Sequence, residues 1–266
     1  MKSASPGSCP RYGPNTLRGK ALALWRVCAD LVWPPLCPVT GEPVTAPGEL
    51  SPAAWREVRF LDAPWCARCG RPFDYPIGKG AVCGACAGQD NPPCRISRAA
   101  FVYDEKSRRL VLMLKHAGRT DGVSVFGRWM MRAGADALEG ADTLIPIPLH
   151  AHRLRKRRFN QSFLLARALS HSSGLPVEPH VLARSRPTPS QGGLSAKARR
   201  RNVAGAFMVR EAAKPFVQGR RFVLVDDVHT TGATLQACAR VLKRAGAEDV
   251  TAITLARVVK PVDPLK

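Results

Sequence analysis

Two adjacent carboxylates, Asp226 and Asp227, stand between an apolar run and a segment of small hydroxylated residues. The run at residues 222–225 predicts a buried parallel strand, and the short turn after the acids predicts a helix that begins near Gly232. Carboxylates at a strand end can hold vicinal hydroxyls, and N–H groups at the positive end of a helix attract phosphate. We therefore expect a site for a phosphorylated sugar, with the phosphate held by Thr230, Thr231, Gly232, Ala233 and Thr234.

This order of residues resembles the fingerprint with which type I phosphoribosyltransferases hold the ribose 5'-phosphate of phosphoribosyl pyrophosphate (PRPP). The resemblance implies that Asp226 and Asp227 are the catalytic residues and anchor the ribose ring. It also implies that Mg²⁺ accompanies PRPP and bridges the ribose hydroxyls and the pyrophosphate. The alternative, two acids that merely end a buried strand, does not explain the Thr-Thr-Gly-Ala-Thr segment that follows them.

A second group of candidate residues follows the apolar run at 143–147, which leads into a turn limited by proline. A loop after an early strand is where this fold class places the pyrophosphate, so backbone groups and cations in it are expected to hold the leaving group. The candidates are Pro148, Leu149, His150, Arg153 and Arg158. A solvated basic surface is the alternative interpretation of the cations.

The segment 184–207 combines many cations with small residues. Gly192 and Gly193 can serve as hinges, and Ser195 predicts the N-cap of a short helix. Such a loop could close over the site, exclude water, and bring Gln191, Arg199 or Arg200 onto the substrate. Nucleic acid would bind the same cationic run, so the two interpretations compete for the same residues.

Two Cys-x-x-Cys pairs, separated by thirteen residues, predict a tetrahedral structural zinc site. The expected ligands are Cys66, Cys69, Cys83 and Cys86. We expect positive φ at Gly70 and Gly84, and we expect Arg68 to offset the negative charge of the thiolates. Scattered buried cysteines are the alternative, and a redox pair is disfavoured because neither pair opens a long helix after a strand.

An imperfect copy of this pattern lies upstream, with only one sulfur among four positions. The positions are Cys37, Thr40, Ser51 and Ala54. A lone thiolate with a hydroxyl would bind zinc too weakly to fold a module, so we predict no metal there. Hydrophobic packing of Trp55, Val58 and Phe60 is expected in its place.

From residue 97 onward, short apolar runs alternate with helical patterns, and these elements must position the candidate sites. Strands are expected at 99–103, 143–147, 222–225 and 250–256, and helices at 107–116, 123–138, 161–171 and 233–245. Asn160 is the expected N-cap of the third helix. This alternation predicts an α/β fold of the type I phosphoribosyltransferase kind, a parallel sheet with helices on both faces.

The region before this sheet is rich in Cys, Pro and Gly, and it cannot bury a large hydrophobic core. It therefore needs another source of stability, and we expect a small zinc-ribbon module. We expect a disordered tail at 1–15, an N-terminal helix with the double ribbon at 16–97, and the phosphoribosyltransferase-like domain at 98–260.

The composition indicates an anionic partner. The 266 residues include 41 Lys and Arg against 20 Asp and Glu, a formal net charge of +21, which favours a polyphosphate substrate or nucleic acid. The nine cysteines are odd in number, and the N-terminus lacks a secretion pattern, which favours metal binding over disulfides. No run of eighteen apolar residues occurs, so we expect a cytoplasmic protein without membrane insertion.

The order of these motifs resembles the ComF/GntX family, phosphoribosyltransferase-like proteins associated with competence and DNA uptake. Besides the four-cysteine set and the acidic fingerprint, the matching segments are 34–38, 114–116, 146–150, 158–162, 188–191 and 200–203. The resemblance implies a double zinc ribbon before a PRPP-binding domain. The sequence departs from the family at Thr40, Ser51 and Ala54, where cysteines are expected, and at His229, where a nonpolar residue is more usual.

Two classes of function follow from these features. The first is an enzyme that transfers the phosphoribosyl group from PRPP to a nitrogen acceptor, with a structural Zn²⁺ and with Mg²⁺ bound alongside PRPP. The second is a non-catalytic protein that senses PRPP or a nucleotide and binds single-stranded DNA, with the competence machinery as its partner. Aromatic residues make up only 6% of the chain, which weakens base stacking as a source of DNA affinity.

Overall fold

The computed structural model describes residues 34–37, 39–114, 123–150, 154–155, 158–186 and 196–259. The predicted tail at 1–15 and the helix expected after it lie outside these residues. The elements are α2 (Pro52–Glu57), α3 (Gly84–Ala87), β1 (Ser97–Val102), α4 (Arg108–Met113), α5 (Val123–Ala133), α6 (Ala135–Leu138), β2 (Thr143–Pro146), α8 (Gln161–Ser173), β3 (Leu182–Arg184), α9 (Ala196–Val203), β4 (Phe207–Val209), the 3-10 helix η1 (Glu211–Ala213), α10 (Lys214–Val217), β5 (Arg221–His229), α11 (Ala233–Arg244) and β6 (Asp249–Arg257).

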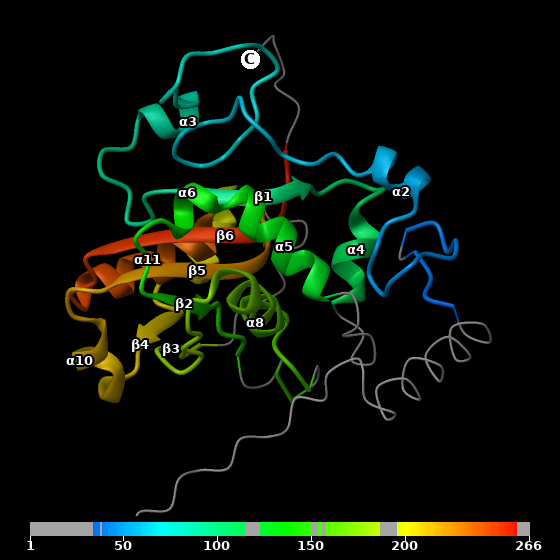
Figure 1. The fold of residues 1–266 in the computed structure, drawn as a ribbon. Coiled ribbons are helices and arrows are strands. Elements are labelled where there is room, and N and C mark those ends of the chain that lie inside the picture. Colours follow the sequence, from blue (N-terminus) through cyan, green and yellow to red (C-terminus); the bar gives the residue numbers. More distant parts are fainter. Residues whose placement is uncertain are drawn as a thin grey trace, which may run out of the picture.

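A four-stranded parallel sheet in the order β1-β6-β5-β2 forms the centre of the molecule (Figure 1). The strands are almost continuously buried, as expected for parallel strands covered on both faces. A separate antiparallel pair, β3 with β4, lies beside α10 at one end of the sheet.

Helices cover both faces of the sheet, as the alternation of strands and helices predicted. Successive side chains of a strand point to opposite faces. On β5, Val223 and Val225 join the core formed with α4, α5 and α8. Phe222 and Leu224 join the core formed with α11, β3 and β4. The prediction of an α/β fold with a doubly covered parallel sheet is therefore confirmed.

Two predicted elements differ from those observed. The helix expected at 123–138 is divided into α5 and α6 at Gly134, where a Cβ atom would lie 2.3 Å from Ile253 Cδ1. Close packing of the backbone on the sheet therefore outweighed helical continuity. The strand expected at 222–225 extends to His229, because β6 continues beside it and pairs His229 with Arg257.

The cysteine-rich region lies along the edge of the sheet beside β1 (Figure 1). The Ser97 N–H donates to Arg68 O at 2.7 Å, and Arg98, only 4% exposed, donates to Ala67 O at 3.0 Å. Arg98 also pairs with Asp136 on α6. These contacts fix the region to the sheet. In the described part of the chain, no helix has the length and apolar character needed to span a membrane.

Candidate functional site

The acidic pair lies at the carboxyl edge of the sheet. β2 pairs with β5 only as far as Pro146, opposite Val225, whereas β6 remains paired with β5 to its end. Asp226 and Asp227 therefore lie beyond the end of β2. At this point their strand, β5, is paired with β6. In open α/β sheets, ligands bind in the crevice outside the carboxyl ends of the strands.

The two carboxyls are half-buried and held by hydrogen bonds. Ser162 Oγ at the start of α8 donates to Asp226 Oδ1 at 2.9 Å, and the Asp227 N–H donates to the same oxygen at 3.0 Å. The Val228 N–H donates to Asp227 Oδ1 at 2.7 Å. Each side chain therefore has a fixed orientation at the edge of the sheet.

Burial raises the pKa of the Asp226 carboxyl to about 8, and the neighbouring charge of Asp227 adds to the shift. The hydrogen bond from Ser162 opposes it and is outweighed. A carboxyl perturbed by burial and by a like charge is typical of a functional site, where the fold tolerates an unfavourable arrangement that a ligand later relieves.

Asp226→Asn is expected to stabilise the free protein at alkaline pH. Because the folded-state pKa of about 8 lies above the ordinary value of 3.8, the unfolded chain ionises first, and wild-type stability falls as pH rises between these values. Asn cannot ionise, so the variant should be more stable than wild type by about 1–2 kcal/mol at pH 8.5, after allowance for solvent screening. The difference should be smaller at pH 5.5. Urea unfolding at the two pH values measures it, and an unchanged difference would contradict the shifted pKa.

The turn after β5 has the geometry of an anion site. Gly232 is the N-cap of α11 with φ 74° and ψ 0°, a left-handed conformation that favours glycine. The first turn of a helix leaves N–H groups without partners inside the helix, and the helix dipole makes this end positive. Thr230, Gly232 and Thr234 are half-buried, Thr231 is exposed and Ala233 is buried. The structure thus brings the five predicted phosphate contacts together at one helix end.

Gly232→Ala is expected to weaken binding of a phosphate at this turn about tenfold. A Cβ atom there would lie 2.7 Å from His229 Nε2, and the left-handed backbone adds strain. Gly174→Ala is the matched control, because Gly174 has φ 76° at the end of α8 but no atom within 4 Å of the added carbon. Titration with inorganic phosphate should show weaker binding only in the Gly232 variant. Equal affinity in both variants would exclude the turn as the phosphate site.

The predicted pyrophosphate loop follows β2 at the same edge of the sheet. Pro148, Leu149 and His150 are half-buried there, and the Ile147 N–H donates to Val225 O at 2.9 Å, next to the acidic pair. Asn160 is the N-cap of α8, as predicted, because its Oδ1 accepts from the Ser162 N–H at 3.1 Å. Its Nδ2 donates to Ile147 O at 3.0 Å. Asn160 and Ser162 therefore join this loop to Asp226.

Arg158 has φ 63°, which is a left-handed conformation at a residue that is not glycine. Its side chain is exposed, and its N–H donates to Leu154 O at 2.7 Å. Such backbones cost about 1–3 kcal/mol and cluster at ligand sites, and the role of Arg158 as a pyrophosphate contact stays a prediction. Arg153 lies outside the described residues.

Part of the predicted closing loop is described. Its helix is α9, which begins at Ala196 directly after the predicted N-cap Ser195, and which packs against α11. Val203 at its end is 2% exposed, and Arg200 is exposed. Gln191 and Ser195, together with the side chain of Arg199, lie outside the described part of the chain. The role of this segment as a lid stays a prediction.

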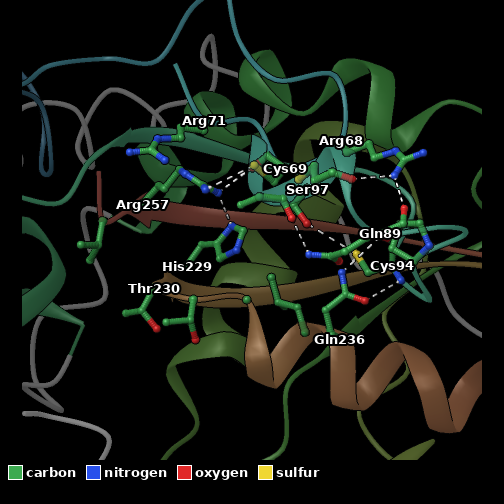
Figure 2. Close-up of a pocket in the computed structure, with 17 residues that line it drawn as sticks. Arg68, Cys69, Arg71, Gln89, Cys94, Ser97, His229, Thr230, Gln236 and Arg257 are labelled. Carbon is green, nitrogen blue, oxygen red and sulfur yellow. Dashed lines mark hydrogen bonds between the residues drawn. The ribbon is translucent and has the colours of Figure 1, made fainter. Parts of the chain in front are cut away.

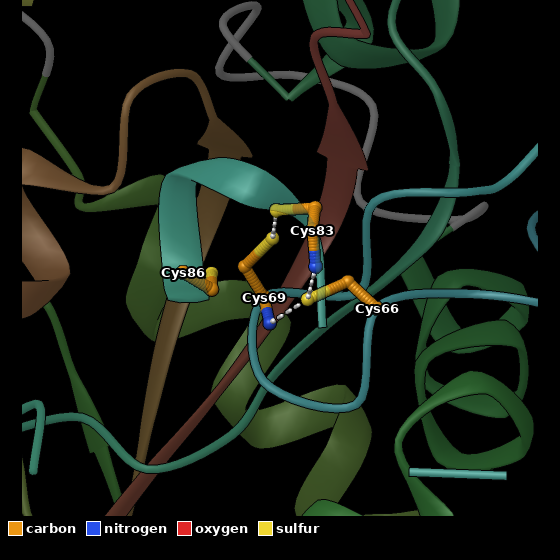
Figure 3. Close-up of side chains that lie close together, drawn as sticks. All are labelled: Cys66, Cys69, Cys83 and Cys86. Carbon is orange, nitrogen blue, oxygen red and sulfur yellow. Dashed lines mark hydrogen bonds between the residues drawn. The ribbon is translucent and has the colours of Figure 1, made fainter. Parts of the chain in front are cut away.

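The four predicted metal ligands come together beside the sheet edge (Figure 3). All four Sγ atoms lie within 4.8 Å of one another, and those of Cys69 and Cys83 are 3.7 Å apart. Four sulfurs at about 2.3 Å from a tetrahedral zinc would be separated by about 3.8 Å. The donor set therefore fits zinc in both number and spacing.

The pKa values of the thiols also bear on cation binding. Burial raises the pKa of Cys86 and of Cys69, and charge on neighbouring thiols raises both further. For Cys66, burial acts in the same direction, but the N–H groups of Cys69 and Cys83 outweigh it and lower the pKa to about 7. These thiols therefore resist full ionisation when no cation is present, and a bound cation would favour their thiolate forms.

Two details of the cysteine region differ from those predicted. Gly70 has φ 68° as expected, whereas Gly84 is the first residue of α3 and has no positive φ, so that prediction was wrong. Arg68 donates to Cys86 O at 3.0 Å and to Gln89 O, both carbonyl oxygens. The guanidinium that contacts a ligand sulfur is that of Arg257, with Nη2 3.5 Å from Cys69 Sγ.

The upstream set folds as a hydrogen-bonded analogue of a knuckle. Thr40 Oγ1 lies 2.9 Å from Ser51 Oγ, and Ser51 accepts from the Ala54 N–H at 3.2 Å. Burial alone would raise the pKa of the Cys37 thiol, but hydrogen bonds from Ser51 and Thr40 outweigh it and lower the pKa to about 7. With one sulfur among four positions, this donor set does not fit zinc.

The predicted hydrophobic packing is present beside the upstream set. Val58 is 4% exposed, and the rings of Trp55 and Phe60 lie 4.6 Å apart. Phe60 in turn packs against Trp129 of α5 at 5.1 Å.

The sequence did not single out Ser162 or Arg257 as site residues. Ser162 could have been recognised, because it lies two residues after the N-cap Asn160 in the segment 158–162 that matches the family. Arg257 had only its place at the end of the last strand, and nothing in the sequence linked it to a cysteine 188 residues away. His229 was noted only as a departure, whereas the structure places it under Gly232.

Comparison with known proteins agrees with this architecture. A family profile for a double zinc ribbon domain matches residues 28–87, and one for a phosphoribosyl transferase domain matches residues 166–264. Among solved structures, orotate phosphoribosyltransferase from Aeropyrum pernix is 21% identical and covers 60% of this chain and 68% of its own length, with a TM-score of 0.33. Fold and profiles define a phosphoribosyltransferase-type domain preceded by a cysteine-rich ribbon.

Similar proteins identify the family within this class. DNA utilization protein YhgH of Salmonella typhimurium is 33% identical over 199 residues, which cover 73% of this chain and 84% of that protein. Competence protein F of Haemophilus influenzae is 32% identical and covers 73% and 85%, and competence protein ComFC of Bacillus subtilis is 27% identical and covers 72% and 77%. The chain belongs to the ComF/GntX family, as its motifs predicted.

Proposed function

We propose that this protein binds PRPP with Mg²⁺ at the carboxyl edge of its sheet and transfers the phosphoribosyl group to a nitrogen acceptor. One observation carries the proposal: Asp226 and Asp227 extend past β2 and are followed by a left-handed Gly232 that starts α11. An acidic pair next to a positive helix end matches a ligand with vicinal hydroxyls and a phosphate. The phosphoribosyl transferase profile over residues 166–264 supports it.

The chain's own residues then have distinct roles. The turn from Thr230 to Thr234 holds the 5'-phosphate, and the two carboxylates accept hydrogen bonds from the ribose hydroxyls. Backbone groups of Pro148, Leu149 and His150 hold the pyrophosphate, and Arg153 and Arg158 add positive charge. Gln191, Arg199 and Arg200 belong to the loop that closes and excludes water.

The reaction needs positioning more than it needs a strong base. Bond breaking at the anomeric carbon develops positive charge on the ribose, and the carboxylates at the sheet edge would stabilise this charge. Bound Mg²⁺ would supply charge neutralisation of the pyrophosphate as it leaves. The oxygens of Asp226, Asp227 and the substrate suit this hard cation.

We further propose that the four cysteines of the ribbon hold one structural Zn²⁺. On this assignment, residues 16–97 form the ribbon module and residues 98–260 the phosphoribosyltransferase-like domain. The ribbon has few long elements of its own, so metal binding would supply much of its folding free energy.

Calorimetric titration tests the binding step, and a base screen tests the transfer. We expect PRPP to bind with Mg²⁺ and to bind at least tenfold more weakly without it, and we expect ribose 5-phosphate to compete. Pyrophosphate release should then depend on one added nucleobase. Release with none of the bases, despite binding, would favour a PRPP-sensing protein, and no binding at all would contradict the proposal.

A second candidate function, binding of single-stranded DNA, is supported by the names of the relatives and by the net charge of +21. The exposed cations Arg200 and Arg201 on α9 are described residues that could contact phosphates. Replacing both with Ala should reduce the slope of log affinity against log salt by about one for each phosphate that these side chains neutralise in wild type. An unchanged slope would remove α9 from the DNA surface.

A further inference from the structure

A cavity of about 330 Å³ separates the ribbon from the phosphate turn (Figure 2). Residues of the knuckle line one side, and Thr230, Thr231 and Gly232 line the other. Two buried side chains that also line the cavity, Arg257 and His229, come from the ends of β6 and β5, where the two residues are paired in register. They form one physical connection between the two walls, and Gln236 on α11 forms another through hydrogen bonds with the Cys94 backbone.

Arg257 joins the ribbon wall to His229 through one guanidinium. Its Nη1 donates to Cys69 O at 2.6 Å and to His229 Nδ1 at 2.7 Å, and its Nη2 lies 3.5 Å from Cys69 Sγ. Figure 2 shows the guanidinium between Cys69 and the imidazole ring. The side chain is only 8% exposed, so these contacts must offset the cost of burying its charge.

His229 continues the connection to the turn. Its ring is 6% exposed, and because Nδ1 accepts from Arg257, the neutral ring carries its proton on Nε2. That edge faces Gly232, where an added Cβ would lie 2.7 Å from Nε2. The ring is therefore a rigid support beneath the residue that starts α11.

The metal site determines how firmly Arg257 is held. Cys69 is negatively charged as a zinc ligand, and a metal-bound knuckle also fixes the Cys69 carbonyl that Arg257 contacts. Without zinc, the knuckle turn would lose its main constraint, and the carbonyl would no longer be held in place. Two of the three guanidinium contacts are thus made to a residue whose position depends on the metal.

We propose that Arg257 is a positioning residue that makes the order of the phosphate turn depend on metal in the ribbon, so that zinc binding and anion binding reinforce each other. Coupling of this kind is reciprocal: each ligand raises the affinity for the other by the same factor. The anion part rests on the proposed function, whereas the mechanical link between knuckle and turn does not.

Hydrogen exchange of the backbone amides at residues 228–235 measures the link directly. Zinc-loaded and zinc-stripped full-length protein are compared in wild type and in Arg257→Met. In wild type, removing zinc should speed exchange at the turn about tenfold, and loaded Arg257→Met should exchange as fast as stripped wild type. Stripping the variant should then add little, because the link is already broken.

Matched variants separate this link from general damage. Arg68→Met is the control, because Arg68 lines the same cavity and bonds to ribbon carbonyls without contacting His229, so turn exchange should be unchanged. If Arg257→Met does not fold, as judged by exchange across α8, then Arg257→Lys decides the question. A single ammonium cannot contact Cys69 and His229 with the geometry of a planar fork, so faster turn exchange is expected there too.

Two outcomes would overturn the inference. One is that zinc removal leaves the exchange rate at the turn unchanged in wild type. The other is that zinc removal and Arg257→Met each speed exchange by a separate factor, so that the zinc-stripped variant shows the product of the two factors. Titration with PRPP and Mg²⁺ on the same samples keeps the two proposals apart. Zinc-dependent exchange without PRPP binding would leave the link standing and refute the proposed function. PRPP binding together with turn exchange that does not change on zinc removal would refute the link and leave the proposed function standing.

Discussion

Asp226→Asn and Asp227→Asn should each weaken binding of PRPP with Mg²⁺ by about a hundredfold, equivalent to about 3 kcal/mol. Bound Mg²⁺ would favour the ionised form of Asp226 despite its raised pKa, whereas an amide cannot ionise. The amide therefore offers no negative charge to the ribose hydroxyls or to the cation, and hydrogen bonds to an ionised group are roughly twice as strong as neutral ones. Both variants should still fold, because each substitution preserves the shape of a half-buried side chain. Calorimetric titration of PRPP with saturating Mg²⁺ measures the change in affinity.

The control for this pair is Asp249→Asn. Asp249 begins β6 at the opposite end of the sheet, where its carboxylate bonds to Arg95 at 2.7 Å. PRPP affinity should be unchanged there, although removal of the ion pair should lower stability slightly. If both edge variants bind PRPP as tightly as wild type, the acidic pair is not the ribose anchor.

Cys66→Ser should remove the metal and unfold the ribbon, the second large effect. Zinc binding to structural sites contributes about 10–16 kcal/mol, and three thiolates with a hydroxyl hold the ion far less tightly than four. We expect one zinc per chain in wild type and almost none in the variant, measured by atomic emission after dialysis. The ribbon at residues 66–86 should then become sensitive to protease.

Cys37→Ser is the matched control for Cys66→Ser. Cys37 is 2% exposed, and it is the one sulfur of the upstream set, whose other positions are Thr40, Ser51 and Ala54. Zinc content should stay at one per chain in this variant. A loss of zinc on replacing Cys37, or two zinc ions in wild type, would show that the upstream set binds metal.

Local sequence signals predicted most of the scaffold correctly. The strands β1, β2 and β6 and the helices α8 and α11 were predicted to within a few residues, because an apolar run marks each strand and a helical pattern marks each helix. Asn160 and the four-cysteine set were recognisable for the same reason: residue type and spacing alone specify an N-cap and a tetrahedral site.

Features set by contacts between distant residues were missed. α5 ends at Ala133 because Ile253 packs against the backbone of the next residue, Gly134, and β5 runs to His229 because β6 pairs with it. The contacts of Arg257 with Cys69 likewise join the last strand to the ribbon across 188 residues. None of these has a local pattern, since each depends on the order in which the strands lie in the sheet.

The decisive experiment for PRPP binding at the sheet edge is a crystal structure of the protein with PRPP and Mg²⁺. We expect the 5'-phosphate within hydrogen-bond distance of the backbone N–H groups at residues 230–234, and the ribose hydroxyls beside the carboxylates of Asp226 and Asp227. Clear density for the ligand elsewhere, or an empty turn at saturating PRPP, would show that the acidic pair and the phosphate turn do not form the PRPP site.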